Sequence, residues 1–383
     1  PAPNPWRYRN KVEFSFGSEI LSRDFVAAPA PGALPVLLGF KRRGKWWQVT
    51  DLQECLIFDP QAGAIAQAVK GWARAEGLDV YDARRHRGYL RYLALRKTMS
   101  LSGDQGRREF RRDETSGDFM AMIVTSSERD LPKESLIAAL GPYCRNVLWG
   151  FKDEKSDTAI CARYEILKGE DFLTQTLLGR PFRYSWNSFF QTNPQAFELL
   201  LDDLVESART VLDPDRRVLD AYCGVGTIAI TLAQRLGVHV LGVESAASSI
   251  EDAQLNAESS NGSILLSGLG DLSDLSQEFH SGSLAFMQAQ VEKVLPELLA
   301  RPEYREGLIV LDPPRCGLHP KAFAAILERP PRHLFYVSCN PARMAKEELP
   351  RLLQSYKIGL AKAYDFFPQT DHYEAFFVLD RKN

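Results

Sequence analysis

Several features are scarce in this chain of 383 residues, and each scarcity excludes a class of protein. No run of about 18 apolar residues occurs and no signal-peptide pattern is present, so we expect no membrane association. Internal repeats and low-complexity tracts are absent. An initial Met is absent too, and we expect the natural protein to extend before Pro1.

Cysteine is also infrequent, and its six positions are widely scattered along the chain. Such spacing favours a reduced, cytoplasmic protein over a disulfide framework. We further expect a monomer. The six positions are Cys55, Cys144, Cys161, Cys223, Cys316 and Cys339.

An overall excess of positive charge is lacking, since the formal net charge is −2, but the charge is unevenly divided. Residues 1–185 hold 29 Lys and Arg against 23 Asp and Glu, a net charge of +6, whereas residues 186–383 hold 18 against 26, a net charge of −8. Ten basic residues and two acids lie between Arg84 and Arg112. Basic side chains attract phosphates and aromatic rings stack on unpaired bases, so this segment predicts RNA contact, with a pair of solvated strand faces as the alternative. The candidate contacts are Arg84, Arg85, Arg87, Tyr89 and Arg91.

The length predicts two domains, with a change of pattern near residue 185. The first half, 1–185, alternates apolar and polar residues in short runs, which is typical of a mainly antiparallel sheet in an α+β domain. Its clearest strands are expected at 12–16, 90–95 and 119–124, and its helices near 62–76 and 133–140.

The second half, 186–383, repeats strand–helix units, which predicts a parallel, doubly wound α/β sheet. After a helix at 194–210, strands are expected at 217–221, 238–243, 284–288, 307–311 and 333–338, with a helix at 227–236. The segments 358–365 and 375–379 fit strands that close the sheet.

A glycine turn with the sequence DAYCGVGT follows the first of these strands at 220–227 and opens a helix. Glycines there let a ligand approach the backbone closely. The next strand ends at Glu244, where an acid can accept both hydroxyls of a ribose. The turn lacks the third glycine of a dinucleotide fingerprint, so it suits S-adenosyl-L-methionine as well as NAD.

A later strand ends in Asp312-Pro313-Pro314-Arg315. It resembles the motif that ends the fourth strand of S-adenosylmethionine-dependent methyltransferases. Enzymes that methylate base amines usually have an aromatic residue after the two prolines, and Arg315 occupies that place here. The motif therefore favours carbon as the methyl acceptor.

The last fifty residues contain a thiol and a carboxylate in dense motifs, Cys339 in YVSCNP and Glu374 in FFPQTDHYE. A thiol can add to carbon 6 of a pyrimidine and load electron density onto carbon 5. A carboxylate can then remove the carbon-5 proton, so that the thiol is eliminated. The target base must leave any stack to reach both groups.

Together, the motifs resemble the RNA uracil-5-methyltransferases, over about 190 residues. The matching segments are FFQTNP at 189–194, DAYCGVGT at 220–227, LGVE at 241–244, LDPPRCG at 311–317, YVSCNP at 336–341 and FFPQTDHYE at 366–374, and YRNKVEF at 8–14 resembles the start of the family's central RNA-binding domain. The resemblance implies a Rossmann-like methyltransferase domain after an RNA-binding domain, and 5-methyluridine as the product.

The resemblance also implies residue roles. Cys339 is the expected nucleophile and Glu374 the base. The expected cofactor contacts are Gln191, Tyr222, Gly224, Gly226, Thr227, Glu244, Gln290 and Asp312. Two positions depart from the family, because Thr227 stands where Asn is common and Gln290 where an acid is common. Arg315 is a further candidate RNA contact, and a role in holding the active-site loop stays open as the alternative.

Cys55 resembles the fourth ligand of an iron–sulfur cluster that many family members carry. The other three cysteines would precede Pro1, so a [4Fe-4S] cluster is expected only if the natural chain is longer. That branch mostly modifies ribosomal RNA, which we therefore favour over transfer RNA. Two alternatives stay open: a cytosine-5-methyltransferase, although Arg315 stands where those enzymes have Cys, and an inert RNA-binding protein of the same fold.

Overall fold

The structure is a computed structural model, and it describes residues 2–18, 36–99, 117–156, 158–213, 217–258, 268–269 and 283–382. The part of the expected basic segment from residue 100 to 112 lies outside the described residues. The chain divides into two compact units, one of Pro5–Leu173 and one of Thr174–Asn383 together with Pro1–Asn4. Among the described residues, no helix is long and apolar enough to cross a membrane.

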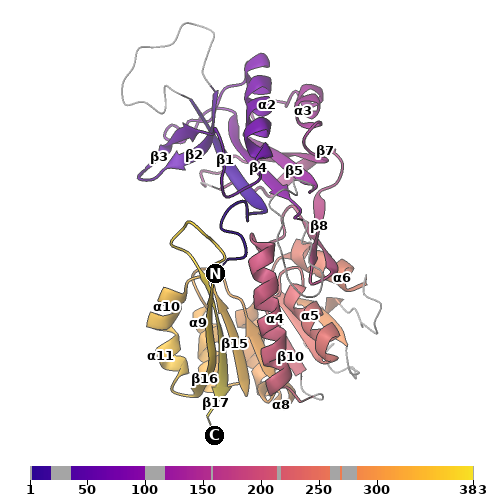
Figure 1. The fold of residues 1–383 in the computed structure, drawn as a ribbon, viewed down its shortest axis with the longest axis vertical. Coiled ribbons are helices and arrows are strands. Elements are labelled where there is room, and N and C mark those ends of the chain that lie inside the picture. The colour runs from indigo at the N-terminus through magenta and orange to yellow at the C-terminus, as the bar shows by residue number, and fades with distance from the viewer. Residues whose placement is uncertain are drawn as a thin grey trace. The chain divides into compact units, whose positions relative to one another are not determined.

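The N-terminal unit is built on a seven-stranded sheet with the order β3-β2-β1-β4-β5-β6-β7 (Figure 1). Among these described strands, β5 and β6 pair in parallel, and the other neighbours are antiparallel. Helix α3 connects the parallel pair, as a parallel crossover requires. The mainly antiparallel α+β expectation is confirmed. The strands are β1 Lys11–Ser18, β2 Val36–Arg42, β3 Lys45–Asp51, β4 Leu90–Lys97, β5 Phe119–Thr125, β6 Asn146–Phe151 and β7 Arg163–Lys168.

Two helices cover this sheet, α2 at Gln61–Ala75 and α3 at Lys133–Leu140, both close to their predicted positions. Helix α2 buries Ile65, Val69 and Trp72 in the same apolar core as the strands. These residues follow the three- and four-residue spacing of one helix face, which is why the segment is helical.

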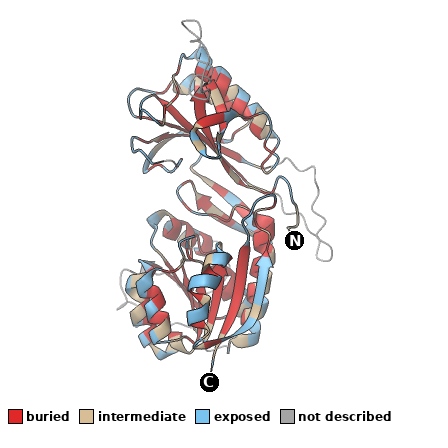
Figure 2. Ribbon diagram, turned by 90° about the vertical axis from the view of Figure 1, so that its left-hand side faces the viewer, coloured by how far each residue is buried: buried red, intermediate tan, exposed pale blue. Residues whose placement is uncertain are grey.

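The C-terminal unit has an eight-stranded sheet with the order β12-β13-β11-β10-β14-β15-β17-β16. The strands from β12 to β15 run parallel, and β17 and β16 close the sheet antiparallel. Its central strands are buried, whereas the edge strand β16 is largely exposed (Figure 2). The strands are β10 Arg217–Ala221, β11 His239–Glu244, β12 Gly268–Leu269, β13 Leu284–Gln288, β14 Leu308–Leu311, β15 His333–Ser338, β16 Tyr356–Tyr364 and β17 Glu374–Arg381.

Helices flank the parallel strands, as the repeated strand–helix pattern predicted. Helices α7 and α9 bury apolar residues in one core with β10, β11, β14 and β15. Strand β10 lies between β11 and β14, so the chain first adds strands on one side of β10 and then crosses to its other side. In such sheets, ligands bind at the carboxyl ends of the strands near this switch point. The helices are α4 Pro194–Val211, α5 Thr227–Leu236, α6 Ala247–Glu258, α7 Val291–Ala300, α8 Pro302–Arg305, α9 Pro320–Glu328, α10 Pro341–Glu347 and α11 Leu349–Leu352.

A two-stranded hairpin of β8, Phe172–Leu177, and β9, Arg180–Ser185, precedes α4. The compact units divide inside β8, so most of the hairpin belongs with the C-terminal unit. The sequence pattern placed the boundary after residue 185 instead, because alternating residues look alike in a large sheet and in a small hairpin.

Candidate active site

The turn after β10 shapes the carboxyl end of the parallel sheet. Gly224 and Gly226 have φ values of 54° and 82°, and Tyr222 has φ of 69°. A Cβ at Gly226 would lie 2.9 Å from the ring of Phe286. Only glycine fits there without strain, and the turn keeps its backbone open to a ligand.

Glu244 ends the neighbouring strand β11 and is held by backbone amides. Its Oε1 accepts hydrogen bonds from the amides of Ser245, at 2.6 Å, and Ala246, at 2.9 Å. Its Oε2 accepts one from the amide of Gly224 at 3.3 Å. The carboxylate is therefore fixed beside the glycine turn, where acceptors for two ribose hydroxyls are needed.

A pocket opens between this turn and the loop that precedes α4. Gln191 in that loop donates a hydrogen bond from Nε2 to Asp312 Oδ2 at 3.2 Å, which joins the loop to the end of β14. The pocket is lined by Phe189, Phe190, Gln191, Phe197, Tyr222, Cys223, Gly224, Val225, Thr227, Ile228 and Asp312. Five of the predicted cofactor contacts thus line one pocket.

The remaining predicted contacts lie around that lining. Gly226 forms the inner side of the turn, and Glu244 touches it through Gly224. Gln290 is the exposed N-cap residue of α7, and its side chain makes no capping hydrogen bond. Aromatic rings, an open backbone and a fixed carboxylate suit a nucleoside such as that of S-adenosyl-L-methionine.

Strand register brings Cys339 and Glu374 to the same point. In the β15–β17 ladder, Ser338 is paired with Ala375. Cys339 follows Ser338 and Glu374 precedes Ala375, so both lie at the end of this ladder, and Glu374 is near enough to raise the pKa of Cys339. Cys339 is half-buried and Glu374 is buried. Residues far apart in sequence thereby form one thiol–carboxyl pair at the carboxyl end of the sheet.

Burial keeps both members of this pair protonated in the free protein. Burial, together with the nearby Glu374 and Asp312, raises the pKa of Cys339 to about 11. Burial, assisted by Asp312, raises the pKa of Glu374 to about 9. Arg315 acts in the opposite direction on both pKa values. Within the described part of the chain, Glu374 Oε2 has no hydrogen-bond partner.

Two further carboxyl groups lie at this end of the sheet. Burial, and to a lesser extent the neighbouring Asp312, raises the pKa of Asp220 to about 8. The amide of Ala229 donates a hydrogen bond to Asp220 Oδ2 at 2.9 Å, which lowers this pKa. Burial also raises the pKa of Asp312 to about 7, although the bond from Gln191 lowers it. Such a group of strongly shifted carboxyls in a pocket is typical of a functional site.

Another buried acid, Glu348, holds the loop after β14, and no sequence motif singles it out. Glu348 accepts hydrogen bonds from the amide of Leu318 at 3.2 Å and from Tyr336 Oη at 2.5 Å. It also forms an ion pair with Arg343 at 2.7 Å. The loop that carries Arg315 is thus tied to α10, which begins just after Cys339.

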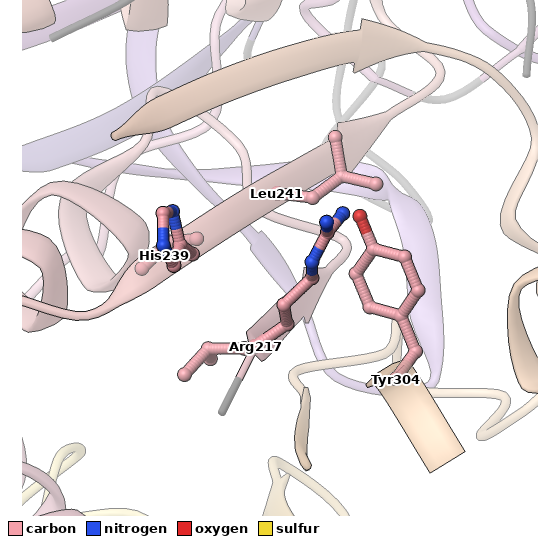
Figure 3. A pocket seen from close by; sticks show the side chains of 6 residues that line it. Arg217, His239, Leu241 and Tyr304 are labelled. Carbon is pink, nitrogen blue, oxygen red and sulfur yellow. The ribbon is translucent and has the colours of Figure 1, made fainter. Parts of the chain in front are cut away.

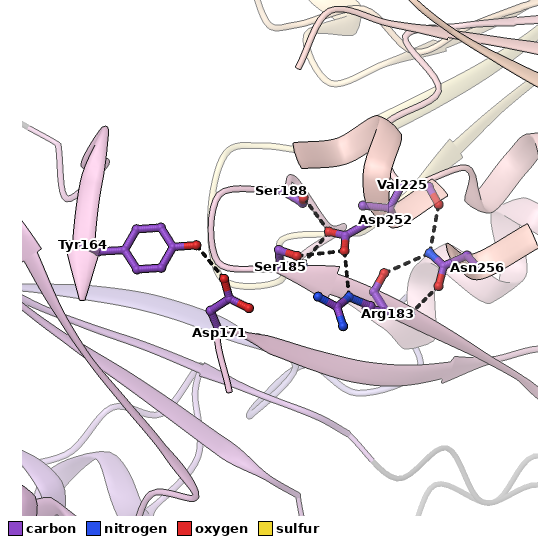
Figure 4. A network of polar contacts seen from close by, with 8 residues as sticks. All are labelled: Tyr164, Asp171, Arg183, Ser185, Ser188, Val225, Asp252 and Asn256. Atoms are coloured by element: carbon purple, nitrogen blue, oxygen red, sulfur yellow. Dashed lines mark hydrogen bonds and ion pairs between the residues drawn. The ribbon is translucent and has the colours of Figure 1, made fainter. Parts of the chain in front are cut away.

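The network on α6 was also missed by sequence reasoning (Figure 4). The buried Asp252 accepts hydrogen bonds from Ser185 Oγ at 2.7 Å and Ser188 Oγ at 2.6 Å, and from Arg183 Nε at 3.0 Å. One turn later, Asn256 Nδ2 donates to the carbonyl of Arg183 at 2.9 Å and to that of Val225 at 3.0 Å. Helix α6 therefore connects the segment before Gln191 to the glycine turn. These are the two walls of the pocket.

A different pocket lies at the opposite ends of the same strands (Figure 3). Arg217 and His239 begin β10 and β11, and the Arg217 guanidinium lies 5.6 Å from the centre of the Tyr304 ring. The lining is Arg217, Val218, His239, Val240, Leu241 and Tyr304. Because ligands of such sheets bind at the carboxyl ends, we assign no role in the reaction to this pocket.

The predicted RNA contacts fall into two groups. Arg84, Arg85 and Arg87 are exposed, and so is Arg315 in the C-terminal unit. Tyr89, by contrast, is only 1% exposed and packs in the core of the N-terminal unit. Its ring is not available for stacking on a base, which corrects that expectation; an alternating pattern does not say which face is covered. Arg91 is buried too, but it lines a second pocket, on the N-terminal unit.

Cys55 is buried in the core of the N-terminal unit, where burial raises its pKa. Among the described residues, no group of three or more His, Cys, Asp or Glu is placed to hold a metal ion. The described residues therefore do not supply an iron–sulfur ligand set with Cys55, and no chemistry is derived from a cluster.

The fold and the pocket define a Rossmann-like S-adenosyl-L-methionine-dependent methyltransferase. The model of the tRNA (uracil-5-)-methyltransferase family matches residues 158–382. The chain is 33% identical to an uncharacterized RNA methyltransferase of Chlorobaculum tepidum over 99% of the chain and 72% of that protein. It is 31% identical to an uncharacterized RNA methyltransferase of Caldanaerobacter subterraneus, over 99% of the chain and 74% of that protein.

A solved structure agrees. The tRNA (uracil-54, C5)-methyltransferase of Pyrococcus abyssi, in complex with S-adenosyl-L-homocysteine, superposes with a TM-score of 0.69 at 25% identity and covers 99% of this chain and 77% of that one. The chain belongs to the tRNA (uracil-5-)-methyltransferase family. It is an S-adenosyl-L-methionine-dependent RNA methyltransferase that acts on carbon 5 of uracil.

Proposed function

We propose that this enzyme methylates carbon 5 of a uridine in ribosomal RNA through a covalent bond between Cys339 Sγ and carbon 6 of the base. The observation that carries the proposal is the end of the β15–β17 ladder, where Cys339 follows Ser338 and Glu374 precedes its partner Ala375. Asp312, which lines the cofactor pocket, is close enough to raise the pKa of both Cys339 and Glu374.

Each group has a defined task in this scheme. The Cys339 thiolate adds to carbon 6, and the electron pair displaced from the 5,6 double bond makes carbon 5 nucleophilic. When bound, S-adenosyl-L-methionine would supply the methyl group to carbon 5; the sulfur–methyl bond would break and S-adenosyl-L-homocysteine would leave. Glu374 then removes the proton from carbon 5, and the electrons of that C–H bond restore the double bond as Cys339 leaves.

Cys339 and Glu374 must each lose a proton before these reaction steps can occur. With pKa values of about 11 and about 9, Cys339 and Glu374 hold their protons at pH 7. Arg315, the cation that lowers both values, sits on the loop fixed by Glu348. We assign to Arg315 the positioning role of favouring the ionised forms of both groups.

Ribosomal RNA is our proposed substrate because Cys55 resembles a ligand position of the branch that mostly modifies it. Transfer RNA is the second candidate, favoured by the named substrate of the Pyrococcus abyssi enzyme. Comparing 5-methyluridine in both RNAs from cells with and without the gene separates them. Loss of 5-methyluridine from ribosomal RNA alone supports the proposal, and loss from transfer RNA alone contradicts it.

The covalent step is tested with RNA that contains 5-fluorouridine. Fluorine cannot leave as a proton, so the adduct stays trapped, and we expect a denaturation-resistant complex whose cross-linked peptide contains Cys339. Cys339→Ala should abolish this complex, whereas Cys316→Ala, which removes an exposed thiol near the site, should leave it intact. An adduct that persists in Cys339→Ala would overturn the assignment, and 5-methylcytidine as the product would point to the cytosine alternative.

A further inference from the structure

A pocket on the N-terminal unit lies wholly outside the catalytic unit. Three segments form it: strand β3, the turn before β4 together with β4 itself, and the loop that follows β6. Its lining is Trp46, Tyr81, Ala83, His86, Arg91, Tyr92, Lys155 and Ser156. Three aromatic rings and an imidazole thus stand beside two cationic side chains in one small concave site.

Arg91 is the buried cation of this pocket. Only 3% of it is exposed. Its Nη1 donates hydrogen bonds to the carbonyls of Lys152, at 2.7 Å, and Glu154, at 2.8 Å, and its guanidinium lies 4.1 Å from the centre of the Tyr81 ring. Arg91 Nε has no hydrogen-bond partner among the described residues. Neutral carbonyls and a ring hold this charge in place.

The charged side chains of the lining, Arg91 and Lys155, are both cationic. Lys41 Nζ lies 5.5 Å from the centre of the Tyr92 ring, and burial, together with the nearby Arg91, lowers the pKa of Lys41 to about 8. Within the described parts of the chain, no Asp or Glu belongs to the lining. Glu154, next in the chain to Lys155, is paired with Lys152 at 3.3 Å. The pocket therefore favours an anionic ligand.

The rings give that ligand a second requirement. Trp46 is 48% exposed, which is unusual for so large an apolar side chain. Its ring is held edge-on by Trp47 at 5.7 Å. His86 is exposed, and its Nδ1 is fixed by Tyr81 Oη at 3.1 Å. An anion with a flat ring, as in a nucleotide with an unstacked base, satisfies both the charge and the exposed aromatic surface.

We propose that this pocket takes one unpaired nucleotide of the substrate RNA, its base against Trp46 and its phosphate near Lys155. The proposal rests on the proposed function for its RNA. Because the pocket contains none of the groups that react, it contributes to the binding of RNA and not to the methyl transfer itself. A free mononucleotide has the same chemistry, and competition by uridine monophosphate separates the two sources.

The test measures binding of a fluorescein-labelled single-stranded RNA oligonucleotide by anisotropy, with the same RNA annealed to its complement as a second ligand. Trp46→Ala should weaken single-strand binding by about tenfold, within the range of one base–aromatic stack. Trp46→Phe should restore most of it. Phe40→Ala, which removes an equally exposed ring on neighbouring β2, is the matched control and should change little. Binding of the duplex should be affected less by Trp46→Ala.

Kinetics give the second readout. In Trp46→Ala, the KM for RNA should rise about tenfold while kcat at saturating RNA stays unchanged. Equal single-strand affinity of Trp46→Ala and the unaltered enzyme would overturn the proposal. So would competition by uridine monophosphate at the concentrations at which the oligonucleotide binds, because the pocket would then be a site for free nucleotides. If the unaltered enzyme binds RNA through Trp46 but forms no 5-methyluridine, the proposed function fails and the pocket assignment stands.

Discussion

At the scale of single residues, the catalytic pair illustrates how burial and function oppose one another. Glu374 is 2% exposed and Cys339 is half-buried, so water does not stabilise the charge on either group. The proposed mechanism nevertheless requires a thiolate and a carboxylate. The loop residue Arg315 is a neighbouring cation that reduces this conflict, since it lowers both pKa values.

The pH dependence of the reaction should follow from these pKa values. In the proposed mechanism Cys339, with a pKa of about 11, and Glu374, with a pKa of about 9, must both lose a proton, so kcat/KM should rise between pH 7 and 9 by about a hundredfold per pH unit. Arg315→Gln should move this rise to higher pH, because the positive charge that lowers the pKa is lost. Arg315→Lys should move it less. A rate that is flat between pH 7 and 9 in the unaltered enzyme would contradict this account.

Glu374→Gln should stabilise the protein at alkaline pH while abolishing turnover. Between the ordinary carboxyl pKa of 4.5 and about 9, folded Glu374 keeps a proton that the unfolded chain releases. Its contribution to stability is therefore present at low pH and lost as pH rises, with a slope of about 1.4 kcal/mol per pH unit for one proton. The Gln variant should lack this slope, as measured by denaturant unfolding from pH 6 to 9. Asp371→Asn, at an exposed position of the same loop, should show the unaltered slope.

At the scale of elements, helix α6 connects the two walls of the proposed cofactor pocket. Asp252 and Asn256 bind both the segment before Gln191 and the glycine turn, so these two walls depend on one helix. The hairpin β8–β9 joins the catalytic unit through the same bonds, since Arg183 and Ser185 lie on β9.

Ser188→Ala tests this role. The substitution removes the 2.6 Å hydrogen bond from a fully buried hydroxyl to Asp252 and leaves a charged acceptor with one donor fewer. We expect a loss of about 1–3 kcal/mol in the free energy of unfolding and weaker binding of S-adenosylhomocysteine, measured by calorimetry. Ser207→Ala, at a partly exposed position of α4, is the control and should alter neither quantity. Unchanged binding in Ser188→Ala would show that the pocket walls do not depend on this bond.

The elements themselves were largely predictable, and the bonds between them were not. The periodicity at 61–75 and the strand before the glycine turn located their elements to within a residue or two, because local spacing determines them. The motifs around Cys339 and Glu374 carried enough chemistry to select both. Asp252 stands in ordinary helical sequence and Glu348 at the junction of α10 and α11, and each accepts a hydrogen bond from a residue at least 30 positions away, so only the folded chain shows what they hold. The prediction that Tyr89 stacks on a base was wrong for a similar reason, since an alternating pattern does not say which face is covered.

At the scale of the whole molecule, the two halves differ in charge as well as in fold. Residues 1–185 carry 29 basic side chains against 23 acids, and residues 186–383 carry 18 against 26. The exposed arginines of the turn before β4 belong to the positive half. RNA binding should therefore depend on that half and on salt.

Salt titration tests the charge division. Replacing Arg84, Arg85 and Arg87 with Gln should weaken RNA binding at low salt, because fewer phosphates are neutralised. The slope of log Kd against log salt concentration should fall by about 0.7 for each phosphate that the variant no longer binds. Arg235→Gln, at an exposed arginine of the C-terminal half, should leave the slope unchanged. An identical slope in the triple variant and the unaltered enzyme would show that these arginines do not bind phosphates.

The ladder between β15 and β17 has a consequence for how this enzyme can diverge. Cys339 and Glu374 adjoin the paired residues Ser338 and Ala375, and the chain between them runs through α10, α11 and the edge strand β16. Insertions or deletions in this connection leave the pairing of Ser338 with Ala375 intact. A residue inserted into β15 or β17 would shift the alternation of that strand by one position. The side chains on the far side of the insertion would then face the opposite side of the sheet. Relatives should therefore vary in length between the two catalytic motifs and hardly at all inside them.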